Sequence, residues 1–290
     1  MRTLNKVLVG LDLSDIDEQL IAYSSFFTEL TDVKKVYFVH NIKRYEISEV
    51  LEKEIENVDL ESIITEELKD MIEANFTAKV EWEVLISDDP YTESLMSYIV
   101  NKYSIDLLIL GNKNNKNGSG TLGFKLLRTI KCEFLWVPST MKTKLKKVWI
   151  GTDFSSASKK CFSFAEYIQS KQNFSLEAVH VYSLPIHFSP YVSDSKIEPK
   201  LSRYVDKKFD QFLNKMNYSG EIKQYKILGR EANIASKLKN EAYKNDVDLL
   251  MVADKGSNTF SNLSLGSITE DLFNRDLKIP LLIVKDHIGD

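Results

Sequence analysis

The sequence is poor in cysteine and has no long uncharged apolar run. Its two cysteines, Cys132 and Cys161, are too few for a disulfide framework and lack the spacing of metal ligands. No apolar run approaches the ~18–20 residues of a membrane-spanning helix. The first residues reach Asp12 almost at once and offer no small-residue cleavage site, so we expect no signal peptide. We therefore predict a reduced, cytoplasmic setting and no membrane partner.

An excess of positive charge is also missing. The chain has 38 lysines and arginines against 42 aspartates and glutamates, a formal charge of −4. This balance argues against nucleic acid as the main partner. The hydrophobic share of 43% and the charged share of 28% are typical of globular proteins. At 290 residues, the chain is long enough for two domains of ~150 residues each.

What the sequence does contain is an internal repeat. Each half has a short apolar strand that ends in Gly-x-Asp and precedes a serine, a strand that ends near histidine, and a continuously apolar strand. The matching pairs are VLVGLDLSD (7–15) with VWIGTDFSS (148–156), VYFVHN (36–41) with LEAVHV (176–181), and DLLILG (106–111) with DLLMVA (248–253). Three landmarks at offsets of 140 to 142 residues indicate a duplication.

Each copy predicts the same alternation of strands and helices. Beyond the landmark strands, we expect strands at 79–86, 134–137, 221–228 and 281–284, and helices at 15–30, 46–75, 91–103, 156–170, 195–217 and 231–244. Ser14 and either Ser155 or Ser156 are candidate N-caps. Crossover-length connections indicate parallel sheets covered on both faces.

The fold class that we predict is α/β, with two tandem doubly wound domains that each have a mainly parallel five-stranded sheet. The expected domains are residues 1–140 and 145–290, joined by a short basic linker at 141–147.

Sheets of this kind bind ligands beyond the carboxyl ends of their strands, at the switch point. In the second copy these ends are Gly151-Thr152-Asp153, His180-Val181 and the stretch at 249–269, LLMVADKGSNTFSNLSLGSIT. Glycine lets the backbone approach an anion, and a helix start offers unpaired N–H groups. The stretch therefore favours a phosphate site, with an ordinary helix start as the alternative.

Together these motifs resemble the universal stress protein family. The family pattern G-x2-G-x9-G-[S/T] is met by Ala253-x2-Gly256-x9-Gly266-Ser267, with only the first glycine replaced. The resemblance covers the whole chain as a tandem pair and implies an adenine nucleotide alpha hydrolase-like fold. It also implies ATP as the ligand, together with Mg²⁺ or Mn²⁺, although some members bind no nucleotide.

The resemblance implies roles for ten residues of the second copy, none catalytic and none a metal ligand. Val181 would contact the base, and Val252 and Ala253 would border the ribose and base. Beside the adenosine moiety would lie Thr152 and Asp153. Backbone N–H groups and two hydroxyls would hold the phosphates at Gly256, Gly266, Ser267, Ile268 and Thr269. The extra methyl of Ala253 would weaken binding without abolishing it.

The first copy departs from this motif. Its equivalent reads Gly111-x2-Asn114, then Gly118 and Gly120-Thr121, with five intervening residues instead of nine, and Asn41 replaces the valine after His40. These changes predict a degenerate site in a domain kept for packing. Gly118-x-Gly120-x-x-Gly123 matches the dinucleotide fingerprint, but it follows the fourth strand instead of the first, so we do not interpret it as one.

The remaining polar residues have simpler interpretations. His40 and His180 are expected to be hydrogen-bonded core histidines. Asp12 and Asp153 would either cap their loops or contact a ligand, and Asp12, Asp15 and Asp17 lack the glycine and distal glutamate of a calcium loop. We interpret Lys113, Lys116 and Lys255 as solvated loop lysines, although loop lysines can approach phosphates.

These observations predict a cytoplasmic stress-response protein that binds ATP in its second domain and acts as a nucleotide-dependent switch or binding module. The two copies would pack as an intramolecular pseudo-dimer through their apolar last strands. A homodimer of two chains is a further arrangement that the sequence allows. The alternative is an interaction protein that keeps only the fold. The third and less favoured interpretation is an ATPase. Its hydrolysis would be slow, because the sequence offers no convincing general base or nucleophile near the proposed phosphates.

Overall fold

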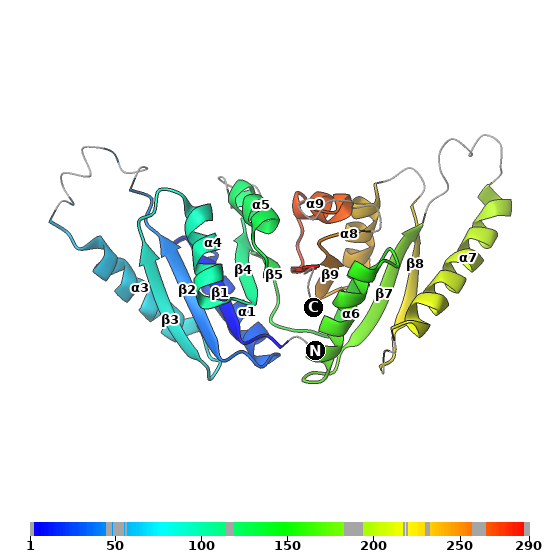
Figure 1. The fold of residues 1–290 in the computed structure, drawn as a ribbon, viewed down its shortest axis with the longest axis horizontal. Coiled ribbons are helices and arrows are strands. Elements are labelled where there is room, and N and C mark those ends of the chain that lie inside the picture. The colour runs from blue at the N-terminus through cyan, green and yellow to red at the C-terminus, as the bar shows by residue number, and fades with distance from the viewer. Residues whose placement is uncertain are drawn as a thin grey trace. The chain divides into compact units, whose positions relative to one another are not determined.

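The chain folds into two compact units, Arg2–Thr143 and Lys144–Asp290, here called the first and second domains (Figure 1). The computed structural model describes residues 3–44, 48, 55, 57–113, 119–182, 194–216, 218, 220–229, 233–256 and 265–286. No helix in these ranges is long and apolar enough to cross a membrane.

Both domains alternate strands with helices. The first domain contains β1 (Lys6–Leu11), α1 (Asp17–Glu29), β2 (Lys35–Asn41), α3 (Leu60–Asn75), β3 (Glu81–Ser87), α4 (Thr92–Tyr103), β4 (Leu107–Asn112), α5 (Ser119–Thr129) and β5 (Glu133–Pro138). The second contains β6 (Lys147–Gly151), α6 (Ser156–Gln169), β7 (Ser175–Tyr182), α7 (Asp194–Asn214), β8 (Lys223–Leu228), α8 (Ile234–Lys244), β9 (Leu249–Ala253), α9 (Ser267–Phe273) and β10 (Leu281–Val284).

The strands of each domain form a parallel sheet. Their order is β3-β2-β1-β4-β5 in the first domain and β8-β7-β6-β9-β10 in the second, and the neighbouring strands within each domain pair in parallel. The chain moves outward from the first strand to the third, then returns to the other side of the first strand. The strand order therefore reverses between β1 and β4 and between β6 and β9. This topology confirms the predicted fold class.

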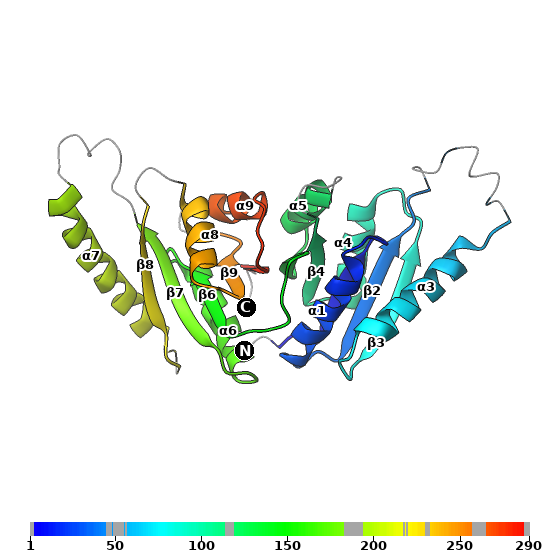
Figure 2. The ribbon, with the colours of Figure 1, turned by 180° about the vertical axis from the view of Figure 1, so that it is seen from behind.

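Helices cover the sheets because right-handed crossovers in opposite directions place them on opposite faces. In the first domain α1 packs beside α3 and α4 beside α5, and Figures 1 and 2 show the two pairs on the two faces of the sheet. In the second domain α8 packs beside α9, and α6 packs against β9. The fourth strand lies between helical layers, which explains why its leucines and isoleucine at 107–109 are fully buried.

Two predicted N-caps have different outcomes. The Ser155 side chain accepts a hydrogen bond from the Ser158 N–H at 3.2 Å, so it is the N-cap of α6, as expected. Ser14 is not an N-cap, because α1 begins after Ile16 without a side-chain cap. The Ser14 hydroxyl instead donates to Asp12 Oδ1 at 2.7 Å. The helix expected at 46–75 is described only from Leu60 onward.

The repeat extends to backbone conformation. Four non-glycine residues have positive φ: Leu13 (56°), Ser104 (54°), Phe154 (65°) and Asp246 (50°). They form two pairs that lie 141 and 142 residues apart in the sequence. Left-handed backbone is unfavourable for residues with a Cβ atom, so its recurrence at matched positions shows that the repeat preserves the backbone path of both turns.

An aspartate at the start of the fourth strand holds the first strand in each domain. Asp106 Oδ2 accepts hydrogen bonds from the backbone N–H groups of Asn5 and Lys6, at 2.8 and 3.0 Å. Asp248 Oδ2 accepts from those of Lys146 and Lys147, at 2.9 and 3.1 Å. These bonds set the register of the central strand pair at its amino end.

Replacement of this aspartate tests its role. We expect Asp106→Ala to destabilise the first domain by about 2 kcal/mol, because two backbone N–H groups lose a charged acceptor. Asp106→Asn, which keeps one carbonyl oxygen, serves as the matched control and should cost less than half as much. Hydrogen exchange of peptides covering β1, followed by mass spectrometry, measures both effects. Equal protection in the alanine variant and the wild type would contradict this role.

Candidate functional site

The ten residues predicted for the nucleotide site lie at one edge of the second domain's sheet. Thr152 and Asp153 follow β6, Val181 lies near the end of β7, and Val252 and Ala253 end β9. Because β6 pairs with both β7 and β9 in parallel, their carboxyl ends meet at this edge. The other five are the loop glycine Gly256, Gly266, and the first turn of α9 at 267–269.

The two glycines of the motif lie against each other. The Gly266 N–H donates to the Asp254 carbonyl at 2.7 Å. A Cβ atom on Gly266 would come within 3.3 Å of that carbonyl oxygen and 3.4 Å of the Gly256 nitrogen. The loop between them, 257–264, lies outside the described residues, but its two ends meet. The nine-residue spacing therefore joins two points of the backbone that leave no room for a side chain.

Gly256 also faces the turn after β6. A Cβ atom there would lie 3.1 Å from Asp153 Oδ2. The other carboxylate oxygen of Asp153 accepts a hydrogen bond from the Ser155 N–H at 3.0 Å. Asp153 thus caps its loop, as one of its two interpretations predicted. The same carboxylate stands beside the glycine pair.

Thr152 is buried and supports this turn. Its N–H donates to the Val179 carbonyl at 2.9 Å, and its Oγ1 accepts from the Phe154 N–H at 3.0 Å. The Ser158 hydroxyl lies 3.0 Å from the same oxygen. Hydroxyl groups therefore fix the turn that positions Asp153.

The two hydroxyls at the start of α9 differ in their surroundings. Thr269 is buried, and its hydroxyl donates to the Ala253 carbonyl at 2.7 Å. Ser267 is exposed. The Thr269 bond ties α9 to the end of β9 and fixes the backbone at the position where the motif has alanine in place of glycine.

The repeated histidines are hydrogen-bonded, as predicted. His180 Nδ1 lies 2.7 Å from the Thr152 carbonyl, and His40 Nδ1 lies 3.2 Å from the Leu11 carbonyl. Burial lowers the pKa of both rings, so each is neutral near pH 7 and donates from Nδ1. Each histidine links the second strand of its domain to the end of the first.

Sequence reasoning missed two residues of this region. Phe154, in left-handed backbone, places its ring 4.4 Å from that of His180 and 4.9 Å from that of Phe209. Asp254 is buried, its Oδ1 accepts from the Asp286 N–H at 2.8 Å, and burial raises its pKa. Asp254 could have been noticed in the sequence, because it is an acidic residue directly after an apolar strand. The sequence has no such indication for Phe154, because its partner Phe209 is remote along the chain.

Metal chemistry has little support from side chains in the described ranges. They contain no group of three or more His, Cys, Asp or Glu residues that could hold a metal ion. Both cysteines are buried. A divalent cation at the second-domain site would therefore depend on the phosphates of a ligand.

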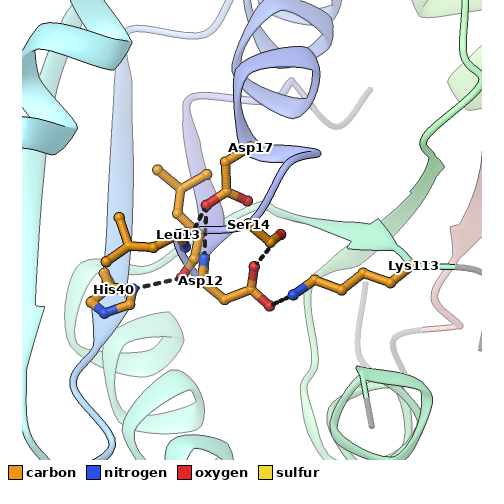
Figure 3. Close-up of polar contacts among 7 residues, drawn as sticks. Asp12, Leu13, Ser14, Asp17, His40 and Lys113 are labelled. Carbon is orange, nitrogen blue, oxygen red and sulfur yellow. Dashed lines mark hydrogen bonds and ion pairs between the residues drawn. The ribbon is translucent and has the colours of Figure 1, made fainter. Parts of the chain in front are cut away.

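The equivalent turn of the first domain is built from carboxylates (Figure 3). The buried Asp17 accepts hydrogen bonds on Oδ2 from the N–H groups of Asp12 and Leu13, at 2.9 and 2.7 Å. The Asp12 carboxylate forms an ion pair with Lys113. Lys113 is thus not the solvated lysine that the sequence suggested. Asn114, Lys116 and Gly118, which the same comparison named, lie outside the described residues.

Asp17 has an unusual proton affinity for a carboxyl group. Burial first, and then the charge of Asp12, raise the pKa of Asp17 from 3.8 to about 6. The hydrogen bonds from the backbone N–H groups oppose this change. The second domain has Ser158 at the matching position, so only the first domain carries an ionisable group there.

The strand order and the parallel pairing define a doubly wound α/β protein, and the ten predicted residues lie at the switch point of its second domain. Residues 144–285 match the family model described as the universal stress protein family. The second domain therefore belongs to the universal stress protein family. No curated protein matches the chain.

Solved structures extend the likeness in fold to both halves. A universal stress protein from Archaeoglobus fulgidus is 16% identical, with a TM-score of 0.63 over 97% of this chain and 98% of that one. A putative universal stress protein from Pseudomonas aeruginosa is 12% identical, with a TM-score of 0.66 over 97% and 93% of the two chains. At these identities the comparisons concern the fold alone.

The pKa of Asp17 predicts a pH-dependent stability of the first domain. Between pH ~4 and ~6 the folded state binds more protons at this carboxyl than the unfolded state does. Its contribution to stability is therefore greatest below pH ~4 and is lost as the pH rises through 6, with a change of at most about 3 kcal/mol. Asp17→Asn should remove this dependence, as measured by urea unfolding at pH 4.5 to 7.5 with hydrogen exchange of first-domain peptides.

The exposed Asp15 offers a matched control in the same turn. Asp15→Asn should leave the pH dependence as it is in the wild type. An unchanged pH dependence in Asp17→Asn would show that Asp17 is not the titrating group.

Proposed function

We propose that the second domain binds ATP, with Mg²⁺ or Mn²⁺ held through the phosphates. The observation that carries this proposal is the contact of Gly256 with Gly266 beside Asp153, at the carboxyl edge of three parallel strands. A ligand at this edge would meet backbone instead of side chains along one wall. Such backbone can approach phosphate oxygens closely.

The neighbouring strand ends suit the adenosine part of the ligand. Val252 is apolar and buried, and Val181 is only partly buried, so they offer apolar contact at the ends of the two strands on either side of β6. Thr152 and Asp153 supply polar groups in the turn between them. We propose that the base lies toward Val181 and the ribose toward Val252 and Ala253.

The same geometry favours binding over hydrolysis. The carboxyl groups of Asp153 and Asp254 accept backbone hydrogen bonds from Ser155 and Asp286. Such a bond favours the ionised form of a carboxyl group and so weakens it as a base. We therefore propose a nucleotide-dependent switch or binding module of the cytoplasm, acting in stress response. Pairing of the two domains, and of two chains, remains part of this proposal.

Substitution of the second motif glycine tests nucleotide binding in the full chain. Gly266→Val should weaken ATP binding at least tenfold, about 1.4 kcal/mol, because its side chain would displace the backbone at Asp254 and Gly256. Ser267→Ala, which removes only an exposed hydroxyl, should have a smaller effect. Calorimetric titration with ATP and Mg²⁺ measures both.

Cyclic AMP is a useful second probe because it has the adenosine part without the polyphosphate. A universal stress protein has been solved in complex with it. If the glycine pair holds phosphates, Gly266→Val should affect cAMP less than ATP. A folded wild-type protein that shows no saturable binding of ATP at millimolar concentration would overturn the proposal and favour an interaction protein that keeps only the fold.

A further inference from the structure

The first domain has a pocket of its own at the carboxyl edge of its sheet. The pocket has a volume of about 420 Å³ and lies between the ends of β1, β2 and β4 and the helices α1, α4 and α5. A volume of this size is within the range of small-molecule sites. All its lining residues belong to the first domain, so it is separate from the proposed nucleotide site.

Apolar side chains form much of the pocket wall. They are Ile16, Leu20, Val39, Met96, Leu110 and Trp136. One residue comes from the turn before α1 and the others from α1, β2, α4, β4 and β5, and each is largely buried. The wall therefore offers a preformed apolar surface to the body of a ligand.

The side chain of Asn41, which lines the pocket, has an oxygen atom without a hydrogen-bond donor in the described part of the chain. Asn41 is only 9% exposed. Its Nδ2 donates to the Asp89 carbonyl at 2.8 Å and to Thr92 Oγ1 at 2.7 Å, which fixes the amide group. Its Oδ1 is buried and has no partner among the described residues. A buried acceptor without a donor costs about 1–3 kcal/mol, and an N–H group of a ligand would remove that cost.

The charges of the pocket disfavour a phosphate. Lys113 is paired with Asp12, and Lys125 Nζ lies 2.8 Å from Glu93 Oε1. Asp17, which also lines the pocket, is a buried carboxyl group. With Lys43, the charged side chains that line the pocket are three lysines and three acidic residues, so the described lining has no excess of lysines. A phosphate would have to displace carboxylates from Lys113 and Lys125, whereas an N–H group meets an acceptor, Asn41 Oδ1, that has no donor in the described ranges.

We propose that this pocket binds a small molecule without phosphate, through an N–H group that donates to Asn41 Oδ1. The second domain has Val181 at the matching position and cannot make this bond. The donor can be a neutral amide or amino-heterocycle, or a protonated amine or amidine. These groups share the N–H donor and differ in charge.

Methyl NMR of the full chain tests the proposal without a known natural ligand. Met96 lines the pocket and is one of six methionines, so its labelled methyl group reports on occupancy. The probes are benzamide, which has N–H donors, and N,N-dimethylbenzamide, which has none. We expect benzamide to shift the Met96 signal and to bind about tenfold more tightly, because only benzamide satisfies the buried acceptor.

Two variants separate the hydrogen bond from general packing. Asn41→Leu should abolish the difference between the two probes. Thr92→Val removes one partner of Asn41 Nδ2 but leaves Oδ1 in place, so the tenfold preference should remain. The comparison of the probes on the wild type requires no variant, and it holds even if Asn41→Leu fails to fold.

Charge is examined with benzamidine and with ATP. Tighter binding of benzamidine than of benzamide would assign a cationic ligand, and the reverse would assign a neutral one; both support an N–H donor. Three results would overturn the proposal: no shift of Met96 with any N–H probe, equal affinity for the two benzamides, or a saturable shift of Met96 by ATP that exceeds the shift by benzamide. Failure of ATP to bind the second domain would leave this inference untouched.

Discussion

The arrangement of both domains depends on how the first strand is held beside the fourth. At the amino end, one carboxylate oxygen of Asp106 or Asp248 accepts two successive backbone N–H groups from the start of the first strand. At the carboxyl end, a neutral histidine on the second strand donates to the last carbonyl of the first strand or the one just after it. With both ends fixed, the strand cannot slip in register, and the turn that follows it is placed at the switch point.

The turn after the first strand has the same backbone conformation in both domains, but different side chains hold it. Leu13 and Phe154 both adopt left-handed backbone at this point. In the second domain hydroxyls of Thr152, Ser155 and Ser158 satisfy the turn, whereas in the first the Asp17 carboxylate does so. Both edges carry an aspartate after the first strand, Asp12 or Asp153, but only the first domain adds a second, buried carboxyl group, Asp17, beside it. The two edges therefore differ in the ionisable groups of the turn, although the backbone of the turn is the same.

The sequence was sufficient for the fold because the signals were local and repeated. Continuous apolar runs at 106–110 and 248–252 identify the buried fourth strands, and the constant offset identifies the two domains. Ser155 could be predicted as an N-cap because it precedes the helix directly. The sequence could not exclude Ser14 as an N-cap. In the structure Asp17 accepts the backbone N–H groups of this turn, and that role depends on the path of the chain between Asp12 and Asp17.

The site was less predictable because its contacts join distant segments. The spacing of Gly256 and Gly266 indicated a loop, but not that the glycines touch each other and face Asp153. In the sequence, Asn41 could be recognised only because the second copy has valine, Val181, at the matching position. Its amide is fixed by Asp89 and Thr92, about fifty residues further along the chain. No local pattern shows which of its atoms is left without a partner.

The state of the first domain's pocket argues against simple decay of an ancestral site. Side chains that line a pocket make fewer packing contacts than side chains of a filled core, and larger apolar residues there would add contacts. Instead the edge retains about 420 Å³ of space and places an amide oxygen without a donor beside it. Neither feature is needed to hold the strands, which Asp106 and His40 already fix. A ligand with an N–H group accounts for both features at once, since it fills the space and satisfies the oxygen.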